Sequence, residues 1–461
     1  MRKFAFLLFL WSPVPMILDA EETTRAIKTK RSAALEIKSL NTPPAAPIFS
    51  PDTNHIWNRL HQALFVRTDK TGQRYGHNSV DPLLWPETSE FLLRGKSHRN
   101  AIALLDEFIN HDGEKLIQTP VKRAVLQHDL WAVFDWTANA RNPLPFGKAN
   151  VSRSETQEPH EARKALRQRL VKVISRLALT DTEIATLPDN YAMAVSSTKF
   201  AAQYTEKPPG HPLLPEKLLA PDGPWVCVRG ALSGPSAPVH MRYYRGRSPF
   251  LVYYKLPGGR QATLNYLKQL NTHCATSQNP SVWDKNMPAF PVGTAVALVR
   301  QMAVINRAGK IVVTPLVQSV QLRVYREVGE HIKDHKASQA VFKFTLNRNA
   351  LFENNAGGLN PVSPDKKIGL SLVYNTDYFE SKSGLPARTI MQSCIDCHSC
   401  GGATIKSIFT FKQDDWVYGS SISLEKLRLL PTTAHMEKQR AIQWKSLRHD
   451  WGLLQGWLET L

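Results

Sequence analysis

The sequence predicts an α+β fold with more than one domain. Its 461 residues exceed the size of one typical domain. Apolar residues recur at helical spacing in the first half, short β-type runs fill the middle, and a helical stretch ends the chain. A hydrophobic share of 42% excludes a wholly disordered chain, and beyond residue 20 no apolar run is long enough to span a membrane.

Residues 1–20 are predicted to be a signal peptide. Two cations precede a short apolar stretch from Phe4 to Trp11, and Ala20 offers a cleavage site. An uncut anchor helix is the alternative, but prolines interrupt the apolar stretch soon after Trp11. We therefore expect an exported protein, periplasmic or extracellular.

A Pro-rich, poorly ordered lead-in is predicted over residues 21–55, and a helical domain over 56–200. The helix signals are the N-cap and N1 pair Thr119–Pro120, the apolar spacing over 162–177, and the capping box of Thr180 and Glu183.

A β-rich domain is predicted over residues 205–350, as an antiparallel sheet or sandwich. Runs of β-type residues alternate there with Pro, Gly and Asn signals. The runs lie at 225–228, 250–254, 295–299, 310–314, 320–325 and 340–346. One or two helical turns are expected at 264–270.

Most of the net charge of +19 lies in this β-rich domain. Residues 223–326 hold 13 Lys and Arg but only one acidic residue, Asp284. Tyrosines lie among them, a mixture that can bind nucleic acid by phosphate contacts and stacking. Export argues against nucleic acid as a partner, so an acidic redox partner, an anionic surface or an anionic polymer is expected. A solvated basic surface without a partner is the alternative.

The sharpest motif lies in the last region, residues 351–461. Cys394, Cys397 and His398 form a C-x-x-C-H pattern, which is typical of covalent attachment of a c-type haem. The spacing lets two thiols reach the haem vinyl groups from one turn of helix and brings the imidazole under the iron.

Here the chain resembles the c-type cytochromes, over residues 390–461. The resemblance implies thioether bonds at Cys394 and Cys397, and His398 as the proximal iron ligand. It also implies a small all-α domain closed by a C-terminal helix, which we expect over 436–461 and packed against the motif-bearing helix. The expected cofactor is therefore one covalent haem c.

The chain departs from that family around the iron. Cys400 places a third thiol near the haem, and residues 399–411 lack the proline-bearing loop common after the proximal histidine. Met436 is the candidate distal ligand, with His435 and His449 as further candidates. An open distal side would favour catalysis or gas binding over electron transfer.

Other uses of the cysteines are weaker. A zinc site made from Cys394 to Cys400 is too cramped, and a second ligand pair is missing. An iron–sulfur cluster needs a fourth thiolate, which only Cys227 or Cys274 could supply. These two are predicted to form a disulfide in an oxidising compartment, with two buried thiols as the alternative.

The favoured function is one-electron transfer by a mono-haem c-type cytochrome. The chain is several times longer than the ~100 residues of one small domain, so the upstream domains are expected to dock the haem onto a partner. The rivals are a haem peroxidase or oxidase with an open distal site, and a binding protein with a structural or sensory haem.

Overall fold

The computed structural model describes residues 45–78, 82–85, 87–138, 159–197, 214–230, 234–276, 288, 290–327, 339–363, 367–368, 377–380, 388–391, 394 and 428–461. Residues 45–461 form one compact unit, to which the statements below refer. The predicted signal peptide and most of the predicted lead-in lie outside the described residues. Within them, no helix combines the length and apolarity that crossing a membrane requires.

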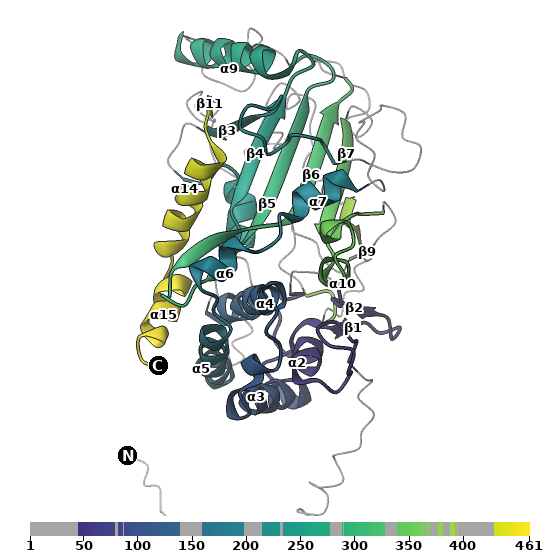
Figure 1. Cartoon of the computed structure of the whole chain (residues 1–461), viewed down its shortest axis with the longest axis vertical. Coiled ribbons are helices and arrows are strands. Elements are labelled where there is room, and N and C mark those ends of the chain that lie inside the picture. The colour runs from purple at the N-terminus through teal and green to yellow at the C-terminus, as the bar shows by residue number, and fades with distance from the viewer. Residues whose placement is uncertain are drawn as a thin grey trace, which may run out of the picture. The chain divides into compact units, whose positions relative to one another are not determined.

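Helices form the first part of this unit, as expected. They are α2 (Ile56–Phe65), α3 (Gly95–Asn110), α4 (Pro120–Ala138), α5 (His160–Arg176), α6 (Asp181–Ala185) and α7 (Asn190–Ser196), with a small β1 (Arg67–Thr68) and β2 (Arg74–Tyr75) hairpin and the 3-10 turn η2 (Gly113–Lys115). Pro120 starts α4, and Thr180 and Glu183 form the predicted capping box. Helix α4 is buried from Arg123 to Thr137, which makes it the central helix of the layer (Figure 1).

The lead-in differs from its prediction at residues 45–55. Phe49 is 1% exposed, and its N–H donates to the Asn58 side chain at 2.7 Å. This stretch therefore packs against α2.

A seven-stranded antiparallel sheet fills the middle of the unit and confirms the expected β region. Its strand order is β11 (Leu429–Pro431), β3 (Val226–Gly230), β4 (Phe250–Lys255), β5 (Ala295–Ile305), β6 (Ile311–Tyr325), β7 (Gln339–Leu346) and β8 (Leu359–Pro361). The two predicted runs at 310–314 and 320–325 are one strand, β6. Pro315 lies where the register with β5 shifts, so the proline sits in a bulge instead of ending the strand.

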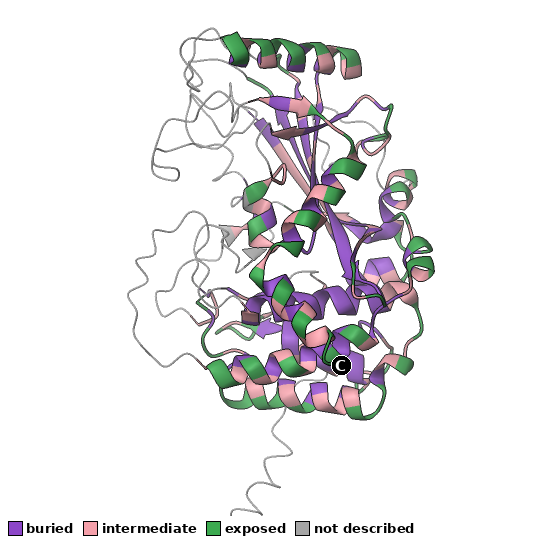
Figure 2. Ribbon diagram, turned by 90° about the vertical axis from the view of Figure 1, so that its left-hand side faces the viewer, coloured by how far each residue is buried: buried purple, intermediate pink, exposed green. Residues whose placement is uncertain are grey.

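The two faces of the sheet pack against different elements. Leu251, Val299 and Leu322 point into the main core, which they share with α4 and α5. Tyr254 and Val296 point to the opposite face, where α9 (Gly259–Thr276) packs. The predicted helical turns at 264–270 thus belong to a full helix, whose outer side is exposed in Figure 2. Helix α8 (Pro238–Tyr243) also covers this second face, through Met241 and Phe250.

The last helical region consists of two helices, whereas one helix was predicted over 436–461. They are α14 (Ala434–Ser446) and α15 (His449–Leu458), and Arg448 is extended between them. The break brings Lys445 to Asp450, with Nζ to Oδ1 at 3.1 Å, a pair that would point apart on a straight helix. Trp451 and Leu454 join the main core with α4.

The described parts of residues 351–461 are also tied to the sheet. Strands β8 and β11 form its two edges. Between β8 and β11 in the sequence are β9 (Lys367–Ile368) and β10 (Arg388–Thr389), which form a separate two-stranded sheet. The short helix α10 (Arg348–Phe352) and the 3-10 turn η3 (Ala356–Gly358) precede β8.

Candidate functional site

The structure describes Cys394, the first cysteine of the CxxCH motif, whereas Cys397, His398 and Cys400 lie outside the described residues. Cys394 is helical and 7% exposed. One turn earlier, Ile390 and Met391 form an apolar cluster with Val362, against which Val341 of β7 packs. Helical spacing places Cys394 on the same side as Ile390. A thiol on a buried, apolar side suits attachment of an apolar porphyrin, and two thiols with one imidazole are the donor set of a haem c.

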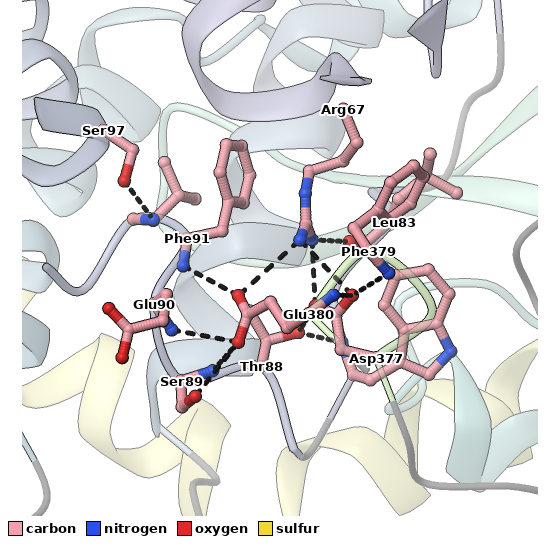
Figure 3. A network of polar contacts seen from close by, with 12 residues as sticks. Arg67, Leu83, Thr88, Ser89, Glu90, Phe91, Ser97, Asp377, Phe379 and Glu380 are labelled. Carbon is pink, nitrogen blue, oxygen red and sulfur yellow. Dashed lines mark hydrogen bonds and ion pairs between the residues drawn. The ribbon is translucent and has the colours of Figure 1, made fainter. Parts of the chain in front are cut away.

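A buried ion-pair network holds the chain shortly before the motif. Arg67 is 5% exposed and donates to Asp377, Nη1 to Oδ2 at 3.0 Å. Thr88 donates to the same carboxylate at 2.6 Å. We call Arg67, Thr88, Asp377 and Glu380 the Arg67 clamp (Figure 3). The clamp joins residues 377–380 to the segment that follows α2.

Glu380 completes the clamp by accepting backbone hydrogen bonds. The N–H groups of Ser89, Glu90 and Phe91 donate to its carboxylate at 2.7, 3.1 and 2.8 Å. The Arg67 guanidinium lies 4.2 Å from the ring centre of Phe91 and 4.6 Å from that of Phe379. Burial lowers the pKa of Arg67, and the carboxylates of Asp377 and Glu380 oppose that shift. The guanidinium offsets the charge of Asp377 and part of that of Glu380, and backbone N–H groups bind the Glu380 carboxylate, so the clamp has a structural role.

The chain is anchored again after the motif. Strand β11 pairs with β3, and the Thr432 N–H donates to the Cys227 carbonyl at 2.9 Å. Asn271 of α9 donates to the Leu429 carbonyl at 2.6 Å. The motif-bearing segment therefore leaves from the Arg67 clamp and returns into the edge of the sheet.

The three candidate distal ligands lie at the surface of the C-terminal helices. Met436, in the first turn of α14, is 46% exposed. His435 beside it and His449 at the start of α15 are also exposed. Among the described residues, no three His, Cys, Asp or Glu side chains gather as a metal-binding group. A distal role for Met436 stays a prediction.

The basic residues of the β region gather on the face of the sheet that α8 covers. Arg300 of β5, Gln321 and Arg323 of β6 and Lys343 of β7 share this face, and we call these four residues the basic face. The strands β3 to β7 contain no Asp or Glu. Burial lowers the pKa of His240 on α8 to about 4, with the charges of Lys343, Arg323 and Arg300 adding to the effect. These three cations therefore face His240.

The predicted disulfide between Cys227 and Cys274 is not formed. Both residues are buried thiols in the structure. Cys227 points into the main core beside Tyr253, whereas Cys274 of α9 packs on the opposite face of the sheet. Since neighbouring residues of a strand alternate between faces, β3 turns Cys227 away from α9. Burial raises the pKa of the Cys227 thiol to about 12.

A second cluster of buried charge lies between α4 and the C-terminal helices. Lys445 donates to Asp135 at 2.6 Å and to Asp450 at 3.1 Å, and Arg247 donates to Asp135 at 2.9 Å. We call these four residues the paired cluster. Burial raises the pKa of Asp135 and lowers that of Lys445, and each charge offsets part of the shift of the other. Arg348 and Asp129 form another fully buried ion pair.

Sequence reasoning missed these buried networks, although one signal was present. Asp129 and Asp135 lie in the stretch of α4 from Arg123 to Thr137, in which all residues are buried. A carboxylate in such a run requires a buried cation. The partners Lys445 and Arg348 are too distant in sequence for a spacing rule to find.

Comparison of the chain with protein-family models, with curated proteins and with solved structures finds no match.

Proposed function

We propose that this chain is an exported protein that carries one covalent haem c and transfers single electrons. The observation that carries the proposal is the CxxCH motif, whose first cysteine is buried on an apolar side of its helix. Cys394 and Cys397 would hold the haem by thioether bonds, and His398 would bind the iron from the proximal side. The haem supplies a one-electron redox centre when it is bound.

The chain's own residues would hold this segment at both ends. The Arg67 clamp fixes residues 377–380, and β11 fixes the chain after residue 428. The two anchors fix where this segment leaves the described fold and where it returns to it. The all-α, cytochrome c-like character expected for 351–461 is proposed for the stretch between β10 and β11 alone.

The basic charge of the β region supports an acidic redox partner, an anionic surface or an anionic polymer as the docking target. The predicted signal peptide supports a periplasmic or extracellular location, where haem c is attached. Binding of nucleic acid is disfavoured for the same reason.

Expression with a c-type haem maturation system tests the proposal. The reduced chain should give the sharp visible bands of a haem c, and the colour should stay with the polypeptide after denaturation. Cys394→Ala and Cys397→Ala should each remove one thioether bond, and the double variant should lose covalent haem. Cys274→Ala is the matched control, because it removes a buried thiol outside the motif. Absence of covalent haem from the unsubstituted chain would contradict the proposal.

A haem enzyme with an open distal side is the second candidate. The observation in its favour is the surface position of Met436, His435 and His449. Carbon monoxide distinguishes the two functions. A ferrous spectrum unchanged by carbon monoxide would support electron transfer with a filled distal side. A spectrum changed equally in the unsubstituted chain and in Met436→Leu would favour the open site.

A further inference from the structure

Two further cations lie beside the paired cluster. The Arg448 Nε is 3.4 Å from Oδ2 of Asp450. Arg245 follows α8, and the nearby charges of Asp135 and Asp450 act on its guanidinium. Among the described residues, the enlarged group has four cations for two carboxylates, namely Arg245, Arg247, Lys445 and Arg448 for Asp135 and Asp450. Because charges withdrawn from water need counter-charges, the excess of two cations favours an anion from outside the group.

Arg245 is the cation of this group without a carboxylate bound to it. Within the part of the chain that the structure describes, its guanidinium makes no hydrogen bond and no ion pair. The residue is half-buried, and burial lowers the pKa of Arg245 to about 10. The carboxylates of the paired cluster oppose this shift, whereas Arg247 and Arg448 add to it. A charged donor that is partly withdrawn from water and has no partner is suited to a ligand.

The backbone of Arg245 has a conformation that arginine rarely adopts. Its φ is 52°, in the left-handed region, and Gly246 after it has a φ of 75°. The Gly246 N–H donates to the Met241 carbonyl at 3.0 Å, and a Cβ at Gly246 would lie 2.9 Å from the Trp444 ring. The turn therefore packs closely against α14. Since Asn and Gly adopt a positive φ more easily than Arg, an arginine here indicates a role for its side chain.

Arg448 supplies a second guanidinium at the same place. It is half-buried and extended between α14 and α15, and its guanidinium lies 4.7 Å from the ring centre of Trp444. The turn of Arg245 packs against that same ring. Among the described residues, the Arg448 Nε alone bonds to a carboxylate, so both Nη groups are available. Helix α15 begins at the next residue, and the N-terminal end of a helix attracts anions.

A phosphate group fits this arrangement. Guanidinium groups bind phosphate oxygens with two parallel hydrogen bonds. A phosphate monoester carries a charge of about −1.5 to −2 near pH 7, which matches an excess of two positive charges better than a singly charged carboxylate does. Partial burial of Arg245 and Arg448 also reduces the screening of their charges by water and salt.

We propose that Arg245 and Arg448 form a phosphate-binding site, where the turn after α8 meets the break between α14 and α15. Trp444 packs beside both residues, and Asp450 orients Arg448 through its Nε. The inference goes beyond the proposed function and is independent of it, because the site uses no residue of the CxxCH motif. The ligand is a phosphate group, either free or part of a larger monoester.

Calorimetric titration of the full-length chain with inorganic phosphate, at constant ionic strength, tests the site. Arg245→Asn and Arg448→Gln should each weaken phosphate binding about tenfold, because each removes charged hydrogen bonds to the ligand. The matched control is Arg242→Gln, which removes an exposed cation of α8 three residues before Arg245 and should change the affinity about twofold or less. No binding to the unsubstituted chain, or equal affinities in the Arg245 and Arg448 variants, would overturn the proposal.

The thermal midpoint separates a binding role of Arg245 from a structural one. Asn adopts the left-handed conformation more easily, and Arg245 has no ion pair to lose. Arg245→Asn should therefore keep or raise the midpoint in phosphate-free buffer, but lose the rise that phosphate gives to the unsubstituted chain. A lower midpoint without phosphate, together with an unchanged phosphate affinity, would make Arg245 a structural residue and overturn the proposal.

Phenyl phosphate distinguishes the two sources of the phosphate group. Tighter binding of phenyl phosphate than of inorganic phosphate, lost in Arg245→Asn, would identify a monoester whose organic part lies beside Trp444. Equal or weaker binding would identify free phosphate as the ligand. Binding of phenyl phosphate that is the same in the unsubstituted chain and in both variants would contradict a role for the two guanidinium groups.

Discussion

The paired cluster is a buried group of charge and the basic face is a buried to half-buried one, but their compositions differ. The paired cluster joins Lys445 and Arg247 to two carboxylates, Asp135 and Asp450. The basic face lies on strands that contain no acidic residue. The first cluster neutralises its own charge within the fold, whereas the second brings together cations from three strands that supply no carboxylate of their own. Substitution of one cation in each cluster tests this difference.

The largest effect is expected in the paired cluster. Lys445→Met leaves Asp135 and Asp450 buried with less positive charge, and loss of one partner from a buried ion pair costs about 3–5 kcal/mol. The free energy of unfolding, measured with urea on the haem-free chain, should fall by that amount. A loss of less than about 1 kcal/mol would remove the distinction between the two clusters.

The Arg67 clamp should behave like the paired cluster. Asp377→Asn weakens the pair with Arg67 and the bond from Thr88, and should lower the free energy of unfolding by about 3 kcal/mol. The control is Glu90→Gln, whose carboxylate is 64% exposed and pairs with Arg94 at 3.6 Å. An exposed pair contributes about 0.2–1 kcal/mol. Equal losses in the two variants would show that the clamp is no stronger than a surface pair.

The pH dependence of the free energy of unfolding tests the surroundings of His240. Its pKa is lowered to about 4 in the folded chain, from a usual value of 6.5. As the pH falls, this imidazole takes up its proton in the unfolded chain before it does so in the folded chain. The contribution of neutral His240 to the free energy of unfolding is therefore present above pH 6.5 and is lost as the pH falls toward about 4.

The haem-free His240→Asn variant should therefore lose less stability than the unsubstituted chain between about pH 7 and about pH 5. Its effect should be smaller than that of Asp377→Asn. His61 is buried with a lowered pKa and acts in the same direction, so part of the acid sensitivity should remain. Identical pH profiles of urea unfolding would contradict the burial of a neutral His240 beside the cations.

The smallest effect on stability is expected on the basic face itself. Lys343→Gln in the haem-free chain removes one of three neighbouring cations, which relieves repulsion and costs no ion pair with the strands. The free energy of unfolding should change by about 0.5 kcal/mol or less. A loss close to that of Lys445→Met would mean that Lys343 is already neutralised within the fold.

The local elements were predictable because short-range rules govern them. The proline at the start of α4, the capping box of Thr180 and the β-type runs of β3 to β7 depend on neighbouring residues, and the structure confirms them, with two of the runs joined in β6. The prediction of a disulfide between Cys227 and Cys274 was wrong, because the face to which a strand residue points depends on the pairing of the whole sheet. The break between α14 and α15 accompanies ion pairs of Lys445 with Asp450 and with Asp135 of α4, and the partner on α4 is too distant in the sequence for a local pattern to reveal.

The candidate site was predictable in part. The motif at 394–398 follows from spacing alone, and Cys397, His398 and Cys400 lie outside the described residues. The concentration of basic residues was also visible in the sequence. Their convergence on one face was not, because Arg300, Arg323 and Lys343 come from three strands whose register is set by long-range pairing.

The intact mass of the denatured chain, after expression with a haem c maturation system, tests the central claim most directly. The unsubstituted chain should carry the added mass of one haem, and the Cys394→Ala, Cys397→Ala chain should have the mass of the polypeptide alone. Equal masses of polypeptide without haem in both samples would contradict the claim that this is a haem c protein.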